Sequence, residues 1–523
     1  MKKHYEVVPF NSAEFEQQLL EVVYPYRGNP TPLGIILDQL KAPTLACKTA
    51  VFEKEYVDED YQDEFAAFYS KTFKRYPHRC TRIHFFTDVI PSSTQIDFGQ
   101  YKNGYLGFVI LRPTDLQRVG RTILKPTVAS EHNHFITCQA EFRAHIYGEA
   151  FTIRAMPFVQ QDTQVGACAQ ASLWMLARYM SQRFQCREYL PSEINALAKA
   201  NMALGRALPA ESGLTATQIL DALQGMGFPA VSYSRMNIDP CSRHVESAFP
   251  IEGANAEEQA ASKERQRTAK LADIAYRYIE SGLPVILGTS DHAIVAIGHS
   301  YDHAATPATV AIQRIPAFFI NNDNTGPYQE MPIFVRKPTH LSFLDVQTVI
   351  TVTPAEVTLR GEEAERMATE CVAQFLEQQP DPANPAKFKD MLPKYRPELG
   401  PWLNQLEYRT YLIRSVQLQQ EFRSGITAGN TPREVGEKLL ALDYPKYVWV
   451  TEFSSSELLN QTDKNARKCL GCVIVDSTAP SRTAGIIAMH FADFYLAQDR
   501  DDPSLVERDI FANSTPCKHR LSP

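Results

Sequence analysis

Hydrophobic and polar positions change their spacing along the chain and divide it into three blocks. In residues 1–155, apolar positions first recur at helical intervals, at 12–24 and 59–73. Runs rich in β-branched and aromatic residues then predict strands at 81–88, 104–113 and 134–156. We therefore predict a mixed α/β, strand-rich N-terminal domain of unknown role.

The middle block, residues 156–357, opens on a helix that we expect to be buried. Residues 169–180 are apolar nearly all round a helix. A second helix is predicted after Thr215, which forms a capping-box pattern with Gln218. The run 292–300 has apolar residues on both faces of a strand, so it is predicted to lie inside a sheet.

The last block, residues 358–523, has helical patterns first and strand patterns afterwards. Helices are predicted at 362–378 and 406–424, and strands at 446–453, 469–477 and 485–491. We predict a third domain, helical and then β, whose role is also unknown.

Two polar stretches interrupt these patterns. Residues 252–270 are charged and are predicted to form a solvated loop or an exposed helix. The proline-rich stretch 378–388 marks a break inside the last block. The chain has no internal repeat of fixed period.

Composition narrows the class of protein. Hydrophobic residues make up 44% of the chain and charged residues 22%, and the net charge is −7. We therefore expect no nucleic-acid partner and no attraction to an anionic membrane. The chain begins without a signal-peptide pattern and has no apolar run long enough to span a membrane. Ten scattered cysteines are typical of reduced thiols, so we predict a cytoplasmic protein.

Cys168 stands where a run of small and polar residues passes into the buried helix. The first N–H groups of a helix are unpaired and carry partial positive charge. A cysteine there is expected to have a lowered pKa, which suits a nucleophile. The alternative is a small structural cysteine at the start of a buried helix.

His292 opens the internal strand directly after a turn, at the edge of the core. A single histidine in such a place is more often structural, but together with Cys168 it becomes a candidate base. His299 and His303, farther along, are expected to lie on the surface.

Asp323 lies where the next predicted strand, 317–320, runs into a polar turn. It is a candidate for orienting the histidine, since a carboxylate or an amide there can accept the second imidazole N–H. The neighbouring asparagines, Asn321, Asn322 and Asn324, remain alternatives, and a plain turn would use the same residue types.

The three segments occur in the same order as the catalytic segments of a known group of peptidases. "MPFVQQDTQVGACAQASLWML", "GLPVILGTSDHAIVAIGHS" and "FFINNDNTGPY" resemble the catalytic segments of papain-fold cysteine peptidases. They are most similar to the bacterial group of bacteriocin leader-processing, or double-glycine, peptidases. The resemblance covers about residues 156–340. It departs from the group at Ala169, where many relatives have glycine.

The resemblance implies an α+β fold and three roles. In a papain-like domain, a helix carrying the cysteine packs on an antiparallel sheet that carries the other two residues, here between two flanking α/β domains. Cys168 would be the nucleophile, His292 the general base and then acid, and Asp323 the residue that orients the histidine.

The resemblance also implies a glutamine that donates to the oxyanion, together with the backbone N–H of the cysteine. Gln161 is the predicted donor, although it lies one residue farther from Cys168 than is usual in the group. Gln160 and Gln164 remain alternatives.

We therefore expect a thiol hydrolase, a peptidase or isopeptidase, that needs no cofactor and acts on a protein or peptide. The flanking domains could hold a protein partner. Two rival functions use the same residues: an acyltransferase that passes the acyl group to an amine or thiol, and an inactive scaffold that binds a partner.

Cys469 and Cys472 have the spacing of half a zinc site. The only later residues that could complete such a site are His490, Cys517 and His519. Because Cys472 falls inside a predicted strand, we expect two structural cysteines and no metal.

Overall fold

The computed structural model describes most of the chain. The described residues are 5–23, 32–92, 96–115, 118–127, 133–161, 168–199, 213–238, 243–305, 310–338, 340–377, 406–463, 467–480, 485–491, 494–498, 506–510 and 517–518. The proline-rich stretch 378–388 therefore lies outside them.

The N-terminal sheet has five antiparallel strands in the order of the chain. They are β1 (Tyr5–Pro9), β2 (Thr49–Tyr56), β3 (Cys80–Phe86), β4 (Tyr105–Leu111) and β5 (Val119–Leu124). The helices of this region are α1 (Ala13–Val23), α2 (Pro32–Lys41) and α3 (Glu59–Ala67), with short 3-10 helices at Tyr69–Lys71 and Phe98–Gly104. A separate hairpin joins β7 (Ala140–Ile146) to β8 (Glu149–Ala155).

The middle sheet is antiparallel, with the order β13-β12-β11-β10-β14-β9, and β6 pairs with the end of β11. Its strands are β6 (His134–Ile136), β9 (Ala230–Ser234), β10 (Val285–Gly288), β11 (Ala293–Ser300), β12 (Ala317–Asn322), β13 (Gly326–Pro332) and β14 (Thr348–Val352). Every residue of β11 is buried, as the sequence predicted for an internal strand.

The described residues of this middle region form five α-helices. They are α4 (Cys168–Phe184), α5 (Pro191–Leu197), α6 (Ala216–Gly225), α7 (Arg243–Ala248) and α8 (Ala256–Glu280), and 3-10 helices lie at Ala311–Arg314 and Phe343–Asp345. The predicted capping box at the start of α6 is present, with Thr215 and Gln218 each bonded to the backbone of the other. Residues 256–270 of the charged stretch form the first half of α8, which is exposed at its start and buried at Thr268 and Ala269.

The C-terminal sheet has the order β15-β16-β18-β19-β20-β21. Its strands are β15 (Leu406–Arg414), β16 (Tyr447–Ser455), β18 (Gly471–Asp476), β19 (Ile486–Phe491), β20 (Phe494–Gln498) and β21 (Val506–Ile510), and a small pair joins β17 (Lys468–Cys469) to β22 (Cys517–Lys518). The helices are α9 (Gly361–Glu377), α11 (Ser415–Thr427), α12 (Arg433–Leu440) and α13 (Ser456–Leu459). Buried residues of α9 pack on one face of the sheet, and those of α11 and α12 pack on the other.

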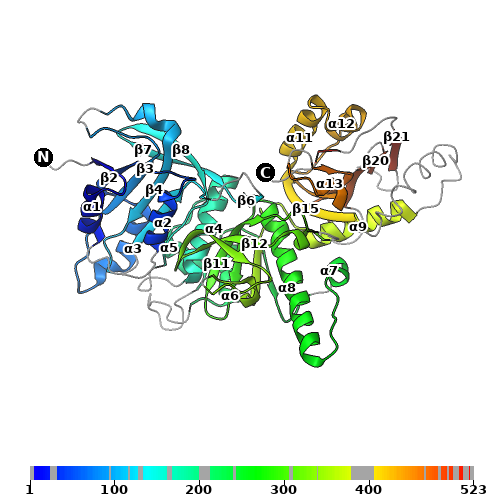
Figure 1. The fold of residues 1–523 in the computed structure, drawn as a ribbon, viewed down its shortest axis with the longest axis horizontal. Helices are drawn as coiled ribbons and strands as arrows, with labels where there is room; N and C mark the ends of the chain where they lie inside the picture. Colours follow the sequence, from blue (N-terminus) through cyan, green and yellow to red (C-terminus); the bar gives the residue numbers. More distant parts are fainter. Residues whose placement is uncertain are drawn as a thin grey trace.

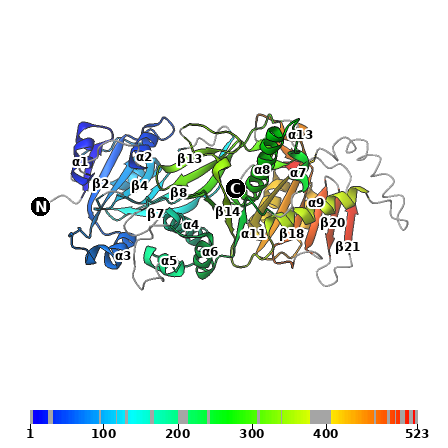
Figure 2. The same ribbon diagram turned by 90° about the horizontal axis from the view of Figure 1, so that it is seen from below.

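The three sheets follow one another along the long axis of the molecule (Figures 1 and 2). The middle sheet shares one continuous core with the N-terminal sheet and with the α9 face of the C-terminal sheet. One strand crosses the predicted division at residue 155: β6 lies in the first block of the sequence but pairs with β11.

One predicted element is wrong. Residues 406–424 were expected to form a helix, but 406–414 form β15, which pairs with β16 along its whole length. Alternation explains the difference, because Tyr411 and Ile413 enter one core cluster while Leu412 enters the other. The helix α11 begins only at Ser415.

The expected surface position of His299 is also wrong. Its side chain is buried and pairs with Glu280 at the end of α8, which in turn binds Arg409 of β15. Burial alone would raise the pKa of Glu280, but Arg409 and His299 outweigh it and hold this pKa at about 2. Because each charge has an opposite charge beside it, this pair can lie in the core. The hydrophobic pattern of the sequence does not reveal such a pair.

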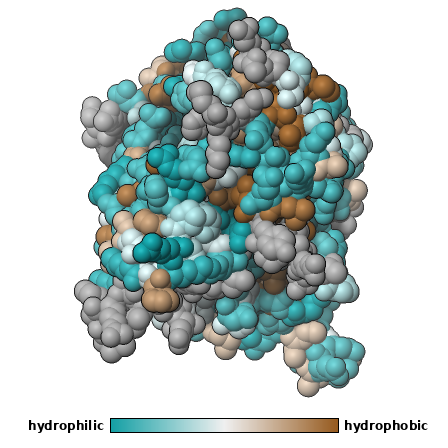
Figure 3. All heavy atoms as spheres, turned by 90° about the vertical axis from the view of Figure 1, so that its left-hand side faces the viewer, coloured by the Kyte–Doolittle hydropathy of each residue, from teal (hydrophilic) through white to brown (hydrophobic). Residues whose placement is uncertain are grey.

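Figure 3 views the N-terminal end of the molecule, where hydrophilic residues cover most of the surface and hydrophobic ones form small groups between them. Large exposed hydrophobic side chains of this region, such as Phe73 and Val89, are spread over separate loops. Among the described helices, none is both long enough and apolar enough to cross a membrane.

Candidate active site

Cys168 is the first residue of α4. One turn later, Ser172 donates a hydrogen bond to the Ala293 carbonyl of β11, at 2.9 Å. The Ala293 N–H, on the same residue, acts on the Cys168 thiol and lowers its pKa. The first turns of α4 therefore lie against the strand residue that directly follows His292.

The Cys168 thiol is free and partly buried. Burial raises its pKa, while the N–H groups of Ala293, Ala169 and Cys168 itself act to lower it. The sequence predicted a lowered pKa from the helix start, and the net direction is the opposite, because desolvation of a thiolate here outweighs three N–H groups. Before any reaction the sulfur is therefore protonated, and a base would have to remove its proton for it to act as a nucleophile.

His292 lies in the tight turn between β10 and β11. Its N–H donates to Thr289 Oγ1 at 3.1 Å, and its carbonyl accepts from the Thr289 N–H at 2.8 Å. This closed turn places the imidazole at the end of the sheet where α4 begins. No hydrogen bond between the His292 ring and the Cys168 sulfur occurs in the described structure.

The partner of the His292 ring is Asn322, the last residue of β12. Nε2 lies 2.9 Å from Asn322 Oδ1, and the Asn324 backbone N–H donates to the same oxygen at 3.0 Å. Because a backbone N–H can only donate, the Asn322 atom must be the amide oxygen. Nε2 therefore carries a hydrogen, and in the neutral form of the ring the basic nitrogen is Nδ1.

Asp323, the residue predicted to orient the histidine, lies beside this hydrogen bond. Its Oδ1 is 3.3 Å from His292 Nε2, and its side chain has no exposed surface. Neither carboxyl oxygen has a hydrogen-bond partner in the described part of the chain. Burial raises the pKa of Asp323 to about 7, although His292 acts to lower it. The hydrogen bond expected from Asp323 is thus made by Asn322.

The buried carboxyl predicts an unusual dependence of stability on pH. The pKa of Asp323 is about 7 in the folded protein and about 3.8 in an unfolded chain. Between these values the folded protein keeps a proton that the unfolded chain has lost. The free energy of unfolding should therefore fall by up to about 4 kcal/mol as the pH rises from about 4 to about 7. Asp323→Asn should lack this fall and be the more stable protein at pH 8.

Urea unfolding of wild type and Asp323→Asn at pH 5 and pH 8 measures the effect. Asp38→Asn serves as the control, because the Asp38 side chain is 74% exposed. A stability difference between wild type and Asp323→Asn that does not change with pH would contradict the raised pKa.

Two of the three candidate glutamines can be placed. The Gln161 side chain donates to Asn324 Oδ1 at 2.7 Å, and Asn324 Nδ2 lies 3.5 Å from His292 Nε2. Gln160 turns away, since its side-chain oxygen accepts from the Val119 N–H at 3.1 Å. Gln164 lies outside the described residues. Gln161 is thus connected to the His292 cluster, and Gln160 is not.

The asparagine run at the end of β12 contains one further structural residue. Asn321 donates to the Pro157 carbonyl at 3.0 Å and accepts from the Tyr328 N–H at 3.1 Å. Both ends of its amide are therefore used to hold the hairpin, and it does not contact His292.

The N-terminal region supports the β12–β13 hairpin. Gln39 of α2 donates to the Pro327 carbonyl at 2.8 Å. Gly326 has φ +137°, and a Cβ atom there would lie 3.0 Å from the side chain of Ile35. The Tyr328 hydroxyl donates to the Leu124 carbonyl at 2.8 Å. These contacts fix the turn that carries Asn322 and Asp323, and no pattern in the sequence indicated them.

The remaining candidates lie far from this cluster in the sequence. Cys469 and Cys472 are buried in β17 and β18. Cys472 pairs across the sheet with His490, and Cys469 with Cys517. The described residues contain no group of three or more His, Cys, Asp or Glu side chains arranged to hold a metal ion. His519 lies outside them.

Comparison with known proteins gives distant structural neighbours. No family model and no curated protein matches the chain. Two solved structures are similar to part of it, each at 15% identity and a TM-score of 0.21 over 38% of this chain. One, covered over 91% of its own chain, is a double glycine motif protease from an AMS/PCAT transporter in complex with the leader peptide. The other, covered over 97%, is the peptidase domain of Streptococcus ComA, a bi-functional ABC transporter of a quorum sensing pathway. This chain is thus distantly similar to double-glycine peptidase domains.

Proposed function

We propose that the protein is a thiol hydrolase that cleaves an amide bond of a peptide or protein through an acyl group carried on Cys168. One observation carries the proposal: the hydrogen bond from His292 Nε2 to Asn322 leaves Nδ1 as the basic nitrogen. This ring belongs to the residue next to Ala293, whose N–H acts to lower the pKa of the Cys168 thiol. A base, a thiol and an orienting amide thus come from three segments that are far apart in the sequence.

In the first half of the reaction, His292 Nδ1 takes the Cys168 proton as the sulfur attacks the substrate carbonyl carbon. The raised pKa of the thiol favours proton transfer during the attack over a preformed thiolate. Negative charge then develops on the substrate oxygen, where the backbone N–H groups at the start of α4 and the Gln161 amide act as donors. The C–N bond breaks, and the protonated His292 gives its proton to the leaving amine.

In the second half, His292 removes a proton from water, and the oxygen attacks the thioester carbonyl. The C–S bond breaks, the acid product leaves, and His292 returns the proton to the sulfur. Asn322 accepts from Nε2 throughout, so the ring keeps one orientation in both halves. The nucleophilic thiol must stay reduced, so we infer that the protein works in a reducing compartment. The described cysteine side chains are all free thiols.

Alkylation tests this proposal. At pH 7, iodoacetamide should modify Cys168 at least about tenfold faster than Cys186. Burial raises the pKa of both thiols, and Cys186 is the more exposed of the two. Cys168 therefore gains an advantage only if His292 takes its proton. Peptide mapping by mass spectrometry gives the two rates, and His292→Gln should remove the difference. Equal labelling of both thiols in wild type would contradict an activated Cys168.

A further inference from the structure

A cavity that opens to solvent lies beside the start of α4, between that helix, α5, α3 and β5. Its apolar wall includes Val159, Ala171, Trp174 and Ile194. The opposite wall comes from the N-terminal sheet and α3, outside the part of the chain that resembles a peptidase.

The cavity reaches the proposed catalytic cluster at two points. Ala171 lies three residues after Cys168, and side chains at that spacing on a helix are about 5–6 Å apart. Gln161 also lines the cavity and donates to Asn324 beside His292. An extended peptide advances about 3.3 Å per residue. A side chain one or two positions from the cleaved bond would therefore reach the cavity.

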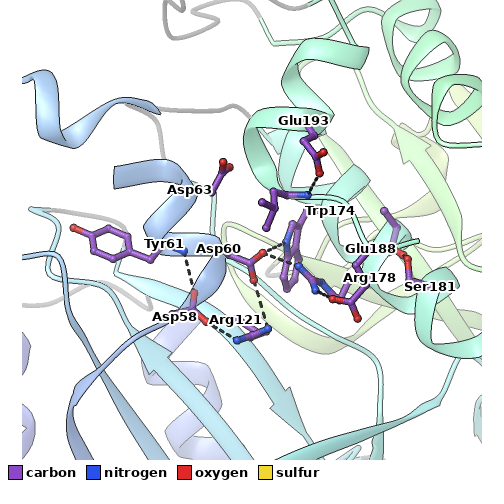
Figure 4. A network of polar contacts seen from close by, with 12 residues as sticks. Asp58, Asp60, Tyr61, Asp63, Arg121, Trp174, Arg178, Ser181, Glu188 and Glu193 are labelled. Carbon is purple, nitrogen blue, oxygen red and sulfur yellow. Dashed lines mark hydrogen bonds and ion pairs between the residues drawn. The ribbon is translucent and has the colours of Figure 1, made fainter. Parts of the chain in front are cut away.

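The charged groups around the cavity are paired with one another (Figure 4). Arg121 binds Asp58 at 2.6 Å, and Arg178 binds Asp60 at 2.7 Å. On the same wall, Arg112 donates to both oxygens of Glu64, at 3.1 and 3.0 Å. Arg178 also binds Glu188, so three guanidinium groups face four carboxylates, and each of them is in an ion pair. A charged ligand group would therefore have to compete with an existing ion pair and would lose its hydration.

The same network makes the apolar wall rigid. The Trp174 indole donates to Asp60 at 3.2 Å, and Asp60 also holds Arg178, one turn farther along α4 (Figure 4). Asp58 caps α3 by accepting from the Tyr61 N–H at 3.1 Å. A wall fixed in this way keeps its shape without a ligand, which favours discrimination by size.

We propose that this cavity is the specificity pocket of the enzyme and receives a large, uncharged side chain of the substrate, one or two residues from the cleaved bond. The inference rests on the proposed function, and it adds the substrate class: peptides with a bulky aliphatic or aromatic residue at that position.

Two substitutions with opposite effects on the volume test the pocket. A peptide cleaved by the wild type is first found in a peptide library. It is then remade with Ala, Leu, Phe or Lys at each of the two positions on either side of the cleaved bond. At one position, wild type should prefer Leu or Phe over Ala and Lys by about tenfold or more in kcat/KM. Ala171→Leu, which fills the cavity, should lower kcat/KM for the Phe peptide by about tenfold or more and affect the Ala peptide far less. Ile194→Ala, which enlarges it, should shift the preference toward Phe over Leu.

Met236→Ala is the control, because Met236 is 71% exposed and lies outside the cavity. Thermal unfolding and alkylation of Cys168 show whether each variant keeps its fold and its site, and Ile194→Ala carries the test if Ala171→Leu does not fold. Hydrolysis with unchanged side-chain preference in the folded variants would overturn the pocket but leave the hydrolase proposal standing. A wild type that neither cleaves any peptide nor shows fast alkylation of Cys168 would overturn both.

Discussion

Replacing His292 by glutamine is expected to lower kcat/KM for peptide hydrolysis by about 10³-fold or more, a loss of about 4 kcal/mol in transition-state stabilisation. Glutamine fills similar space but cannot take up a proton. The effect should be large because the Cys168 thiol has a raised pKa. Without a base, the thiol does not lose its proton readily enough to attack the substrate. Steady-state hydrolysis of a library-derived peptide, followed by separation of the products, measures the loss.

The matched control for this change is His78→Gln, which makes the same substitution at an exposed histidine of the N-terminal region. It should leave kcat/KM within about twofold of wild type. If His292→Gln kept more than a tenth of the wild-type activity, His292 would not be the base.

Asn322→Ala is expected to lower kcat/KM by about 10²-fold, because the imidazole loses the acceptor that fixes its orientation and its hydrogen. The loss should appear mainly in kcat, since Asn322 does not line the neighbouring cavity. The measurement is again steady-state hydrolysis, with kcat and KM determined separately.

Asp323→Asn is the comparison that separates the two neighbours. It keeps the Asn322 hydrogen bond and removes the buried carboxyl, so it should cost less than about tenfold. The order of the two effects decides which residue orients the histidine. A larger loss in Asp323→Asn than in Asn322→Ala would mean that the carboxylate does, as the sequence first predicted.

The sequence located the three segments of the site because each carries a local signal. A helix start at Cys168, a turn before His292 and a polar turn after 317–320 are features of short stretches, and all three occur in the structure. To choose Asn322 over Asp323 as the residue that orients His292, one must know which residues of β11 and β12 pair with each other. Val295 pairs with Asn321, which places Asn322 on the same face as Ile294 and hence as His292, whereas Asp323 lies beyond the end of β12. Two-residue periodicity with that register would have favoured Asn322.

Other features could not be predicted, because they depend on contacts between residues far apart in the chain. The N-terminal region was assigned no role, yet Gln39 and Tyr328 join it to the β12–β13 hairpin. The buried pair of His299 and Glu280 arises only when α8 meets β11. The pKa of Cys168 likewise depends on how deeply the folded chain covers the sulfur, so a helix start alone predicted the wrong direction.

The most direct test of the central claim is the intact mass of the enzyme during turnover of an activated ester or peptide substrate. Wild type should carry one acyl group, located on Cys168 by peptide mapping, which disappears as the substrate is consumed. In His292→Gln the adduct should form far more slowly, and in Cys168→Ala it should be absent along with hydrolysis. Hydrolysis that persists in Cys168→Ala, or an acyl group found on another residue, would contradict the account.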